Sequence, residues 1–195
     1  SPQSFPGGPV KSKLARRWQM RGPRQQGTEE CEQNQVAAKP AGLAQSTSRV
    51  VLWFRSDLRL ADNPLLQRAV SLSVERGASL LPVFCADPRD YGEQARTAFG
   101  SPKVGVFRRR FLEESLADLR HGLEQRGSAL CVFDVAPETV LPLLVVRGDV
   151  VLAAQESCPE ELAAEARVNA ALQQKGAELK LLDDGGIINL LGMAD

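Results

Sequence analysis

The stretch V50-V-L-W-F-R-S-D-L-R-L-A-D-N-P-L-L66 predicts a strand, a charged turn and a helix in direct succession. Residues 50–54 form a short apolar run, which is typical of a strand that is buried on both faces. The polar residues that follow, 55–59, suit a loop at the edge of a sheet. Asn63 is a favourable N-cap and Pro64 a favourable first helical residue, so a helix is expected to begin there. The folded part of the chain therefore starts at this stretch.

Strand and helix patterns alternate along the rest of the chain. Further strands are expected at about 79–85, 129–134, 150–154 and 178–182, and helices at 64–76, 106–126, 137–147 and 157–175. Gly77 and Gly176 are placed to end two of these helices, and Ser157 with Glu160 fits a capping box for the last one. The alternation demands right-handed crossovers, and it predicts a five-stranded, parallel, doubly wound Rossmann-like sheet. Residues 87–104 form a long irregular stretch of the kind that often carries function.

The helix expected at 106–126 carries the clearest periodicity. Its apolar residues recur at helical spacing on one face: Phe107, Phe111, Leu112, Leu116, Leu119 and Leu123. Three consecutive arginines, 108–110, could touch a phosphate or an acidic partner. Acidic residues follow them at i+4-type spacings, so we interpret this face as solvated and paired within the helix.

The two ends of the chain differ from the middle. Residues 1–48 form a Gly- and Pro-rich extension with seven Lys or Arg against three Glu. Such a composition suggests an organelle transit-peptide remnant or a partner-binding tail. In the second case its basic and aromatic residues are the candidate anchors: Lys11, Lys13, Arg16, Arg17 and Trp18. Residues 49–184 form the α/β domain. Residues 185–195 form an apolar carboxyl-terminal tail that could cover a sheet edge or face a partner.

Composition and motifs exclude several classes of function. Residues 49–195 hold seventeen basic against twenty-one acidic side chains, which makes nucleic acid an improbable partner. No apolar run approaches the ~18–20 residues that cross a bilayer. The four cysteines have neither zinc-site nor redox spacing, and no Gly-rich nucleotide-binding motif follows the first strand. The single histidine, His121, has no partner at catalytic spacing. We assign no catalytic residue and no metal ligand.

Several segments carry a resemblance to a known family. W53-F-R-S-D-L-R-L-A-D-N-P-L-L66 resembles the opening signature of the photolyase/cryptochrome family. The similarity continues in L81-P-V-F-C-A-D-P-R89 and in the segment from residue 99 to residue 120. Q155-E-S-C-P-E-E-L162 resembles the corresponding segment of DASH cryptochromes and their plant relatives. The resemblance covers residues 49–184, which match the family's amino-terminal α/β domain. Residues 185–195 depart from the family pattern W-G-x-T-x-Y-H.

This resemblance implies a cofactor and also limits the chemistry. In the family, the loop after the fourth strand helps to hold an antenna folate. The matching candidates are Glu156, Cys158, Glu160 and Glu161. A carboxylate can accept hydrogen bonds from pterin amino groups, which favours Glu156 and Glu160 among them. The alternative is that these residues only cap a helix. The family's flavin is held by a large helical domain beyond the region of resemblance, so we expect no FAD site in this chain.

The charged turn after the first strand allows two interpretations. Its alternating charges could bind an anionic ligand at the carboxyl end of that strand: Arg55, Asp57, Arg59 and Asp62. However, the two aspartates would neutralise the arginines. We therefore favour a salt-bridged loop that, together with the cap Asn63, fixes the turn from strand to helix.

Three functions follow from these observations. The favoured hypothesis is a non-catalytic accessory or interaction subunit of a larger organellar assembly, contacted through the amino-terminal extension and the apolar carboxyl-terminal tail. The alternatives are the front portion of a DASH-type photolyase or photoreceptor, and a stand-alone blue-light-absorbing module that binds a folate. The transit-like terminus and the family together suggest the chloroplast, with the mitochondrion as the alternative.

Overall fold

The structure, a computed structural model, describes residues 48–183 of the 195-residue chain. Its elements in chain order are β1 (Arg49–Phe54), α3 (Pro64–Arg76), β2 (Ser79–Cys85), α4 (Pro88–Tyr91), α5 (Val106–Glu124), β3 (Cys131–Phe133), α6 (Pro137–Leu144), β4 (Val150–Ala154), α7 (Pro159–Lys175) and β5 (Glu178–Leu182). The amino-terminal extension, with its candidate anchors Lys11, Lys13, Arg16, Arg17 and Trp18, lies outside the described residues. The carboxyl-terminal tail also lies outside them.

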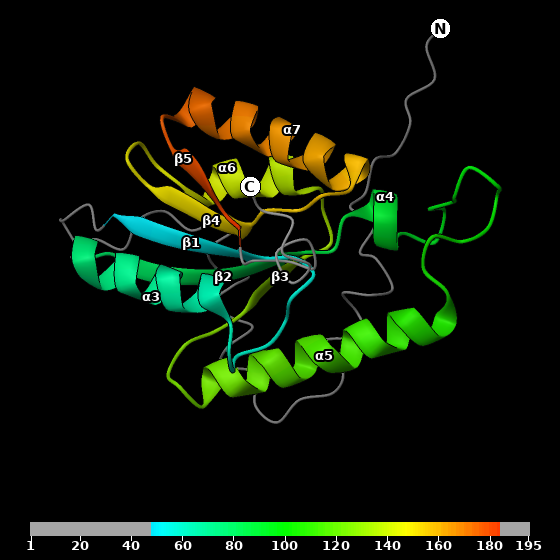
Figure 1. The fold of residues 1–195 in the computed structure, drawn as a ribbon, viewed down its shortest axis with the longest axis horizontal. Helices are drawn as coiled ribbons and strands as arrows, with labels where there is room; N and C mark the ends of the chain where they lie inside the picture. The colour runs from blue at the N-terminus through cyan, green and yellow to red at the C-terminus, as the bar shows by residue number, and fades with distance from the viewer. Residues whose placement is uncertain (1–47, 184–195) are drawn as a thin grey trace, which may run out of the picture. The chain divides into compact units, whose positions relative to one another are not determined.

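The five strands form one parallel sheet in the order β3-β2-β1-β4-β5. The helices α3 and α5 cover one face of the sheet, and α6 and α7 cover the other (Figure 1). The predicted doubly wound fold is therefore confirmed. The chain passes from one face to the other between β3 and β4, so the strand order reverses where β1 meets β4. In open α/β sheets, the carboxyl ends of the strands at such a switch point form the usual binding crevice.

Helix α3 shows how closely local signals set the element boundaries. The Asn63 side chain accepts a hydrogen bond from the backbone N–H of Leu66 at 2.8 Å, and Pro64 is the first helical residue. Gly77 ends the helix in the left-handed conformation, with φ at 58°. A non-glycine residue would be strained there, which explains why the helix ends at this position.

The core lies where helices cover both sides of the central strands. All residues from Val50 to Phe54 are buried, as expected for a strand between two helical layers. On α5, only the second half of the apolar face is buried, through Leu116, Leu119 and Leu123. The apolar face of α5 is therefore packed only in part, and Phe107 and Phe111 do not join the core. Both are exposed, because the first turns of α5 extend beyond the carboxyl ends of the strands (Figure 1).

Other differences from the expected elements are small and have local causes. The stretch 87–104 contains the short helix α4, which Asp87 caps and Pro88 begins. The capping box of Ser157 and Glu160 is not formed: α7 begins at Pro159 and its N-cap is Cys158. Proline fixes φ at a helical value and therefore sets the first helical residue one position later than the box required. Within residues 48–183, no helix has the length and apolarity that a membrane crossing requires.

Candidate functional site

A small hollow of about 80 Å³ opens at the carboxyl ends of β1 and β2. Its walls come from the ends of these strands, from α4 and from the first turns of α6 and α7. The lining residues are Trp53, Phe54, Arg55, Ser56, Phe84, Cys85, Asp87, Asp90, Tyr91, Pro137, Glu160, Glu161 and Ala164. The hollow thus lies at the carboxyl ends of the strands, where open α/β sheets bind ligands, but between β1 and β2 and beside the switch point between β1 and β4.

Arg55 is the main polar residue at this edge. Its guanidinium forms a buried ion pair with Glu165 of α7 and donates hydrogen bonds to the carbonyl oxygens of Ala154 at 3.2 Å and Glu161 at 3.4 Å. It also lies 4.8 Å from the ring centroid of Trp53, a cation–π contact. Arg55 therefore ties β1 to β4 and α7. Its partner is Glu165, on α7, and not one of the two aspartates of its own turn.

The rest of the charged turn is held by local contacts. Asp57 accepts two hydrogen bonds from the Arg59 guanidinium, each at 2.9 Å. The hydrogen bonds and the charge of Arg59 hold the pKa of Asp57 below its ordinary value. The Asn63 side-chain amide donates to the Arg59 carbonyl oxygen at 2.9 Å, and Asp62 adopts a positive φ of 48°. These contacts fix the path of the chain from β1 into α3.

Two of the four predicted cofactor residues reach the hollow. Glu160 and Glu161 line it, whereas Glu156 and Cys158 lie in the adjoining loop outside its lining. Glu156 accepts a hydrogen bond from the Ser56 hydroxyl. Burial, reinforced by the negative charge of Glu156, raises the pKa of Glu161. Cys158 is exposed, and the nearby charge of Glu161 raises the pKa of its thiol.

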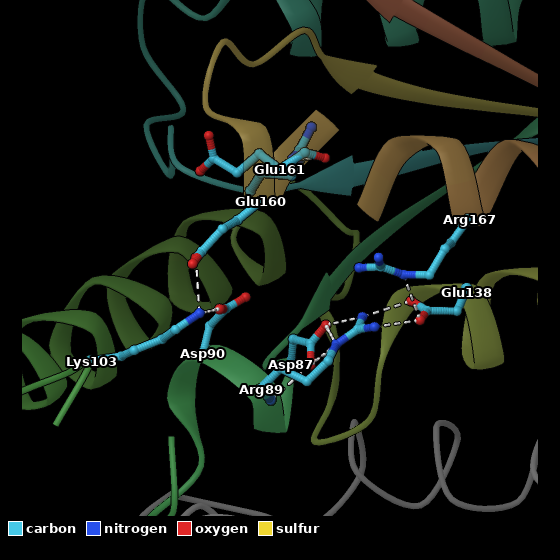
Figure 2. A network of polar contacts seen from close by, with 9 residues as sticks. Asp87, Arg89, Asp90, Lys103, Glu138, Glu160, Glu161 and Arg167 are labelled. Carbon is cyan, nitrogen blue, oxygen red and sulfur yellow. Dashed lines mark hydrogen bonds and ion pairs between the residues drawn. The ribbon is translucent and has the colours of Figure 1, made fainter. Parts of the chain in front are cut away.

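Glu160 is already engaged with a cation. Lys103, from the long loop before α5, donates hydrogen bonds to Glu160 at 2.8 Å and to Asp90 at 3.0 Å. Figure 2 shows this lysine between the two carboxylates. The hydrogen bond to Glu160 and the one to Asp90 raise the pKa of Lys103. The arrangement fastens the long loop to the start of α7.

A second polar network beside the hollow was missed by the sequence analysis. Arg89 makes two hydrogen bonds to Glu138 of α6, at 2.7 and 2.8 Å, and also pairs with Asp87 (Figure 2). Arg167 of α7 contacts the same Glu138 at 3.1 Å. Burial alone would raise the pKa values of Asp87 and Glu138, but hydrogen bonds from Arg89 lower both. The Asp-Pro pair at 87–88 signals the cap of α4, but no local pattern signals partners so distant in sequence.

The chemistry available at this edge is limited. Four of the charged side chains that line the hollow, Arg55, Asp87, Asp90 and Glu160, are held in ion pairs with residues outside its lining. Burial raises the pKa of the Cys85 thiol to about 12, which keeps it protonated. Within residues 48–183, no cluster of His, Cys, Asp and Glu is suited to a metal ion. A hollow of about 80 Å³ is also well below the ~300–1,000 Å³ of typical ligand pockets. A ligand of folate size would need a second wall supplied from elsewhere.

Next to this edge, large apolar side chains face solvent. Phe99, at 96% exposure, lies in the loop before α5, and Phe107 at 90% and Phe111 at 72% lie on the first two turns of the helix, next to exposed Val106. Phe107 and Phe111 are four residues apart and therefore share one side of α5. We call Phe99, Val106, Phe107 and Phe111 the apolar segment. Contiguous exposed apolar patches are typical of interaction surfaces in proteins.

Comparison with known proteins places the chain in a family. The DNA photolyase model matches residues 50–191. The blue-light photoreceptor PHR2 of Arabidopsis thaliana is 41% identical over 143 residues, and the chloroplastic/mitochondrial cryptochrome DASH of the same plant is 41% identical over 133 residues. These alignments cover 72% and 67% of this chain.

A solved structure shows the same relationship. The cryptochrome of Synechocystis sp. PCC6803 superposes with a TM-score of 0.62 and 31% identity, over 71% of this chain and 28% of that one. The chain spans 30% of the length of PHR2 and 22% of that of the plant cryptochrome DASH. The matched part carries the five-stranded parallel sheet and its covering helices. This chain therefore belongs to the DNA photolyase family, of which it contains the amino-terminal α/β domain.

Proposed function

We propose that the domain formed by residues 49–184 is a non-catalytic interaction module within a larger assembly, and that its contact face is the apolar segment. The observation that carries this proposal is the exposure of Phe107 and Phe111 on the same helix whose second half is packed in the core. The fold does not use these side chains. An aromatic pair on a rigid helix is suited to anchor a partner, because little conformational entropy is lost when it is buried.

The charges around the apolar segment indicate what kind of partner fits. Arg108 is exposed between Phe107 and Phe111, and Arg110 is exposed and paired with Glu114 at 2.8 Å. Arg109 is turned inward and donates to the Tyr91 carbonyl oxygen at 2.9 Å. The face therefore combines apolar anchors with a basic rim. We propose a polypeptide partner that presents an apolar segment flanked by carboxylates.

The polar edge of the sheet supports a structural rather than a catalytic role. The ion pairs of Arg55, Arg89 and Lys103 hold loops and helices together. Each pair occupies a carboxylate that would have to be unpaired to act as a catalytic acid or base. A catalytic acid or base usually lies in a cleft with room for its substrate. The small hollow offers no such room.

Site-specific photo-crosslinking in the full chain tests the proposed face. A photoreactive residue placed at position 107 or 111 is expected to form one adduct of defined mass in cells of the organism that encodes the protein. The matched control is position 143, where Leu143 is 76% exposed on α6, on the opposite face of the sheet. Adducts from 143 alone, or none from 107 and 111, would refute this contact face.

The amino-terminal extension and the location of the assembly are further parts of the proposal. We propose that the extension contributes to docking through its basic and aromatic residues, and that the assembly is in the chloroplast, with the mitochondrion as the alternative. Three of the similar plant proteins carry chloroplastic/mitochondrial in their names, which supports this location. Deleting residues 1–48 is expected to weaken association, and unchanged association would exclude the extension as an anchor.

A second candidate function is that of an antenna-chromophore domain, as the front portion of a DASH-type photoreceptor or as a separate module. It is favoured by the position of Glu160 and Glu161 at the hollow, where carboxylates could accept hydrogen bonds from a pterin. In that case the partner supplies the second wall. Natively isolated protein would then absorb beyond the aromatic band near ~280 nm, and Glu161→Gln would lower that absorbance. Loss of the chromophore without loss of the photo-crosslink would separate the two functions.

A further inference from the structure

Residues 95–103 form a loop between α4 and α5, and its tip is a tight turn (Figure 1). The Gly100 N–H donates to the Thr97 carbonyl oxygen at 2.9 Å, and the Thr97 N–H donates to the Ser101 carbonyl oxygen at 2.8 Å. Gly100 has a positive φ of 81°, which residues with a side chain rarely adopt. Phe99 is a central residue of this turn and is 96% exposed. Its aromatic ring therefore lies at the tip of a loop that is closed by backbone hydrogen bonds.

The base of the 95–103 loop is fixed at both of its ends. The Lys103 N–H donates to the Ala95 carbonyl oxygen at 3.1 Å, which joins the two ends, and Ala95 itself is buried. The Lys103 ammonium donates hydrogen bonds to Asp90 of α4 at 3.0 Å and to Glu160 of α7 at 2.8 Å (Figure 2). Because backbone hydrogen bonds connect the tip to the base, the position of the base sets the position of the tip.

Lys103 links this stretch of chain to the rest of the domain. Among residues 92–105, all of which the structure describes, no other side chain forms a hydrogen bond or an ion pair with another helix or strand. The Arg96 guanidinium, for example, donates to the carbonyl oxygens of Glu93 and Ala95, which lie in the same stretch. The polar anchoring of the loop therefore depends on Lys103.

The bridge that Lys103 forms lies near the surface. The side chain of Lys103 is 23% exposed, and those of Asp90 and Glu160 are 46% and 73% exposed. Exposed ion pairs contribute little to the stability of a fold. Helix α4, which carries Asp90, is held to α6 independently by the ion pair of Arg89 with Glu138. Loss of the Lys103 bridge is therefore expected to release the loop while α4 and the core stay in place.

We propose that Lys103 is a positioning residue for partner binding: its ion pairs with α4 and α7 hold the 95–103 loop so that Phe99 meets the partner together with the aromatic residues of α5. This inference rests on the proposed function, in which the apolar segment is the contact face. A loop that is already fixed loses less conformational entropy on binding than a mobile one. When only a fraction of the molecules hold the loop in place, the apparent affinity for the partner falls by that fraction.

Spin labels in the full chain measure the position of the loop. The labels are attached to Ala98→Cys at the exposed tip and to Val74→Cys, an exposed position on α3, with Cys31→Ser and Cys158→Ser in the background. The distribution of distances between the labels is expected to be at least ~2-fold wider in Lys103→Met, because a released loop samples more positions.

The yield of the photo-crosslink from position 111 in cells measures binding. Lys103→Met is expected to lower this yield about 3-fold or more, since a released loop is competent to bind only part of the time. Asp90→Asn/Glu160→Gln removes both charges that Lys103 bridges and is expected to lower the yield equally. Combining it with Lys103→Met is expected to lower the yield no further. The matched control, Lys180→Met, removes a lysine from an ion pair within β5 and is expected to leave both measurements at their wild-type values.

Four results would overturn the inference and leave the proposed function intact. The first two are an unchanged distribution of label distances in Lys103→Met and an unchanged crosslink yield. The third is a loss of yield in Lys103→Met but not in Asp90→Asn/Glu160→Gln, which would assign Lys103 to direct contact with the partner. The fourth is a melting temperature that falls together with the yield, which would show that Lys103 stabilises the domain. The proposed function fails separately, when the wild type gives no adduct from position 107 or 111, and the inference then falls with it.

Discussion

Two loops leave the same edge of the sheet and are built in opposite ways. The loop after β1, residues 55–63, is short and is fixed by contacts: Arg55 pairs with Glu165, Asp57 pairs with Arg59, and Asn63 caps α3. The stretch after β2 is longer and ends in the apolar segment, whose aromatic side chains face solvent. The first loop stabilises the fold, whereas the second carries side chains that the fold leaves unused. The first loop therefore has a structural role, and we propose partner binding for the second.

The largest effect is expected from breaking the buried ion pair of the first loop. Arg55→Ala leaves the Glu165 carboxylate buried without its partner, with side-chain exposures of only 8% and 6% in the intact pair. The expected loss in the free energy of unfolding is about 3–5 kcal/mol. Denaturant unfolding measures it. Arg110→Ala, which removes an exposed pair with Glu114, is the control and should change stability little. A stable Arg55→Ala protein would remove the structural role assigned to this loop.

The same contrast between side chains that stabilise the fold and side chains that do not can be tested within α5, whose second half is buried and whose first turns are exposed. Leu119→Ala removes a fully buried side chain and is expected to cost about 2–5 kcal/mol of unfolding free energy. Phe111→Ala, two turns earlier on the same helix, is expected to stay within about 0.5 kcal/mol of the wild type. Comparable losses for the two variants would show that Phe111 packs in the core, and the apolar segment would lose its assigned role.

Removing the N-cap of α3, at the end of the first loop, is expected to lower the free energy of unfolding by a smaller amount. Asn63→Ala removes the acceptor of the Leu66 N–H and the donor to the Arg59 carbonyl oxygen. The expected loss is about 1 kcal/mol, within the usual range for an N-cap. Asn63→Asp retains the acceptor and is expected to recover part of it. Thermal unfolding distinguishes the three proteins, and a neutral Asn63→Ala would contradict the capping role.

Acid provides the mildest perturbation of the first loop. The pKa of Asp57 is lowered in the folded protein, so its contribution to stability is present above the ordinary value of 3.8 and is lost as the pH falls through the folded value. In Asp57→Asn, the melting temperature is therefore expected to fall less steeply with acid below about pH 4. Parallel pH profiles for the two proteins would show that the Arg59 pair does not stabilise the ionised form.

The first loop and the second differ also in how far sequence could predict them. Residues 63–64 and Gly77 signal the ends of α3 through local backbone preferences, and the alternation of apolar runs predicts the sheet. The pairing of Arg55 with Glu165 and that of Arg89 with Glu138 could not be predicted, because the partners lie 110 and 49 residues apart in sequence. Such pairings depend on how the carboxyl ends of the strands meet the starts of α6 and α7.

The exposure of Phe107 and Phe111 was unpredictable for a related reason. Helical periodicity identifies an apolar face, but it does not state how far along that face the neighbouring sheet extends. The sheet covers α5 from Leu116 onward and leaves the first turns uncovered. Likewise, Glu160 and Glu161 could be placed near the binding edge from their position after β4, whereas the engagement of Glu160 by Lys103 depends on a distant loop.

The most direct test of the interaction role is the native size distribution of the chain in gently solubilised cells, with absorbance recorded across the fractions. The wild type is expected to elute with a larger assembly, and Phe107→Ser/Phe111→Ser is expected to elute near the 21.2 kDa of the free chain. The control Leu143→Ser/Val146→Ser, altered at exposed apolar positions outside the apolar segment, should elute like the wild type. A wild-type chain that elutes alone, or a Phe107→Ser/Phe111→Ser variant that stays with the assembly, would contradict the assignment of the apolar segment as the partner-binding face.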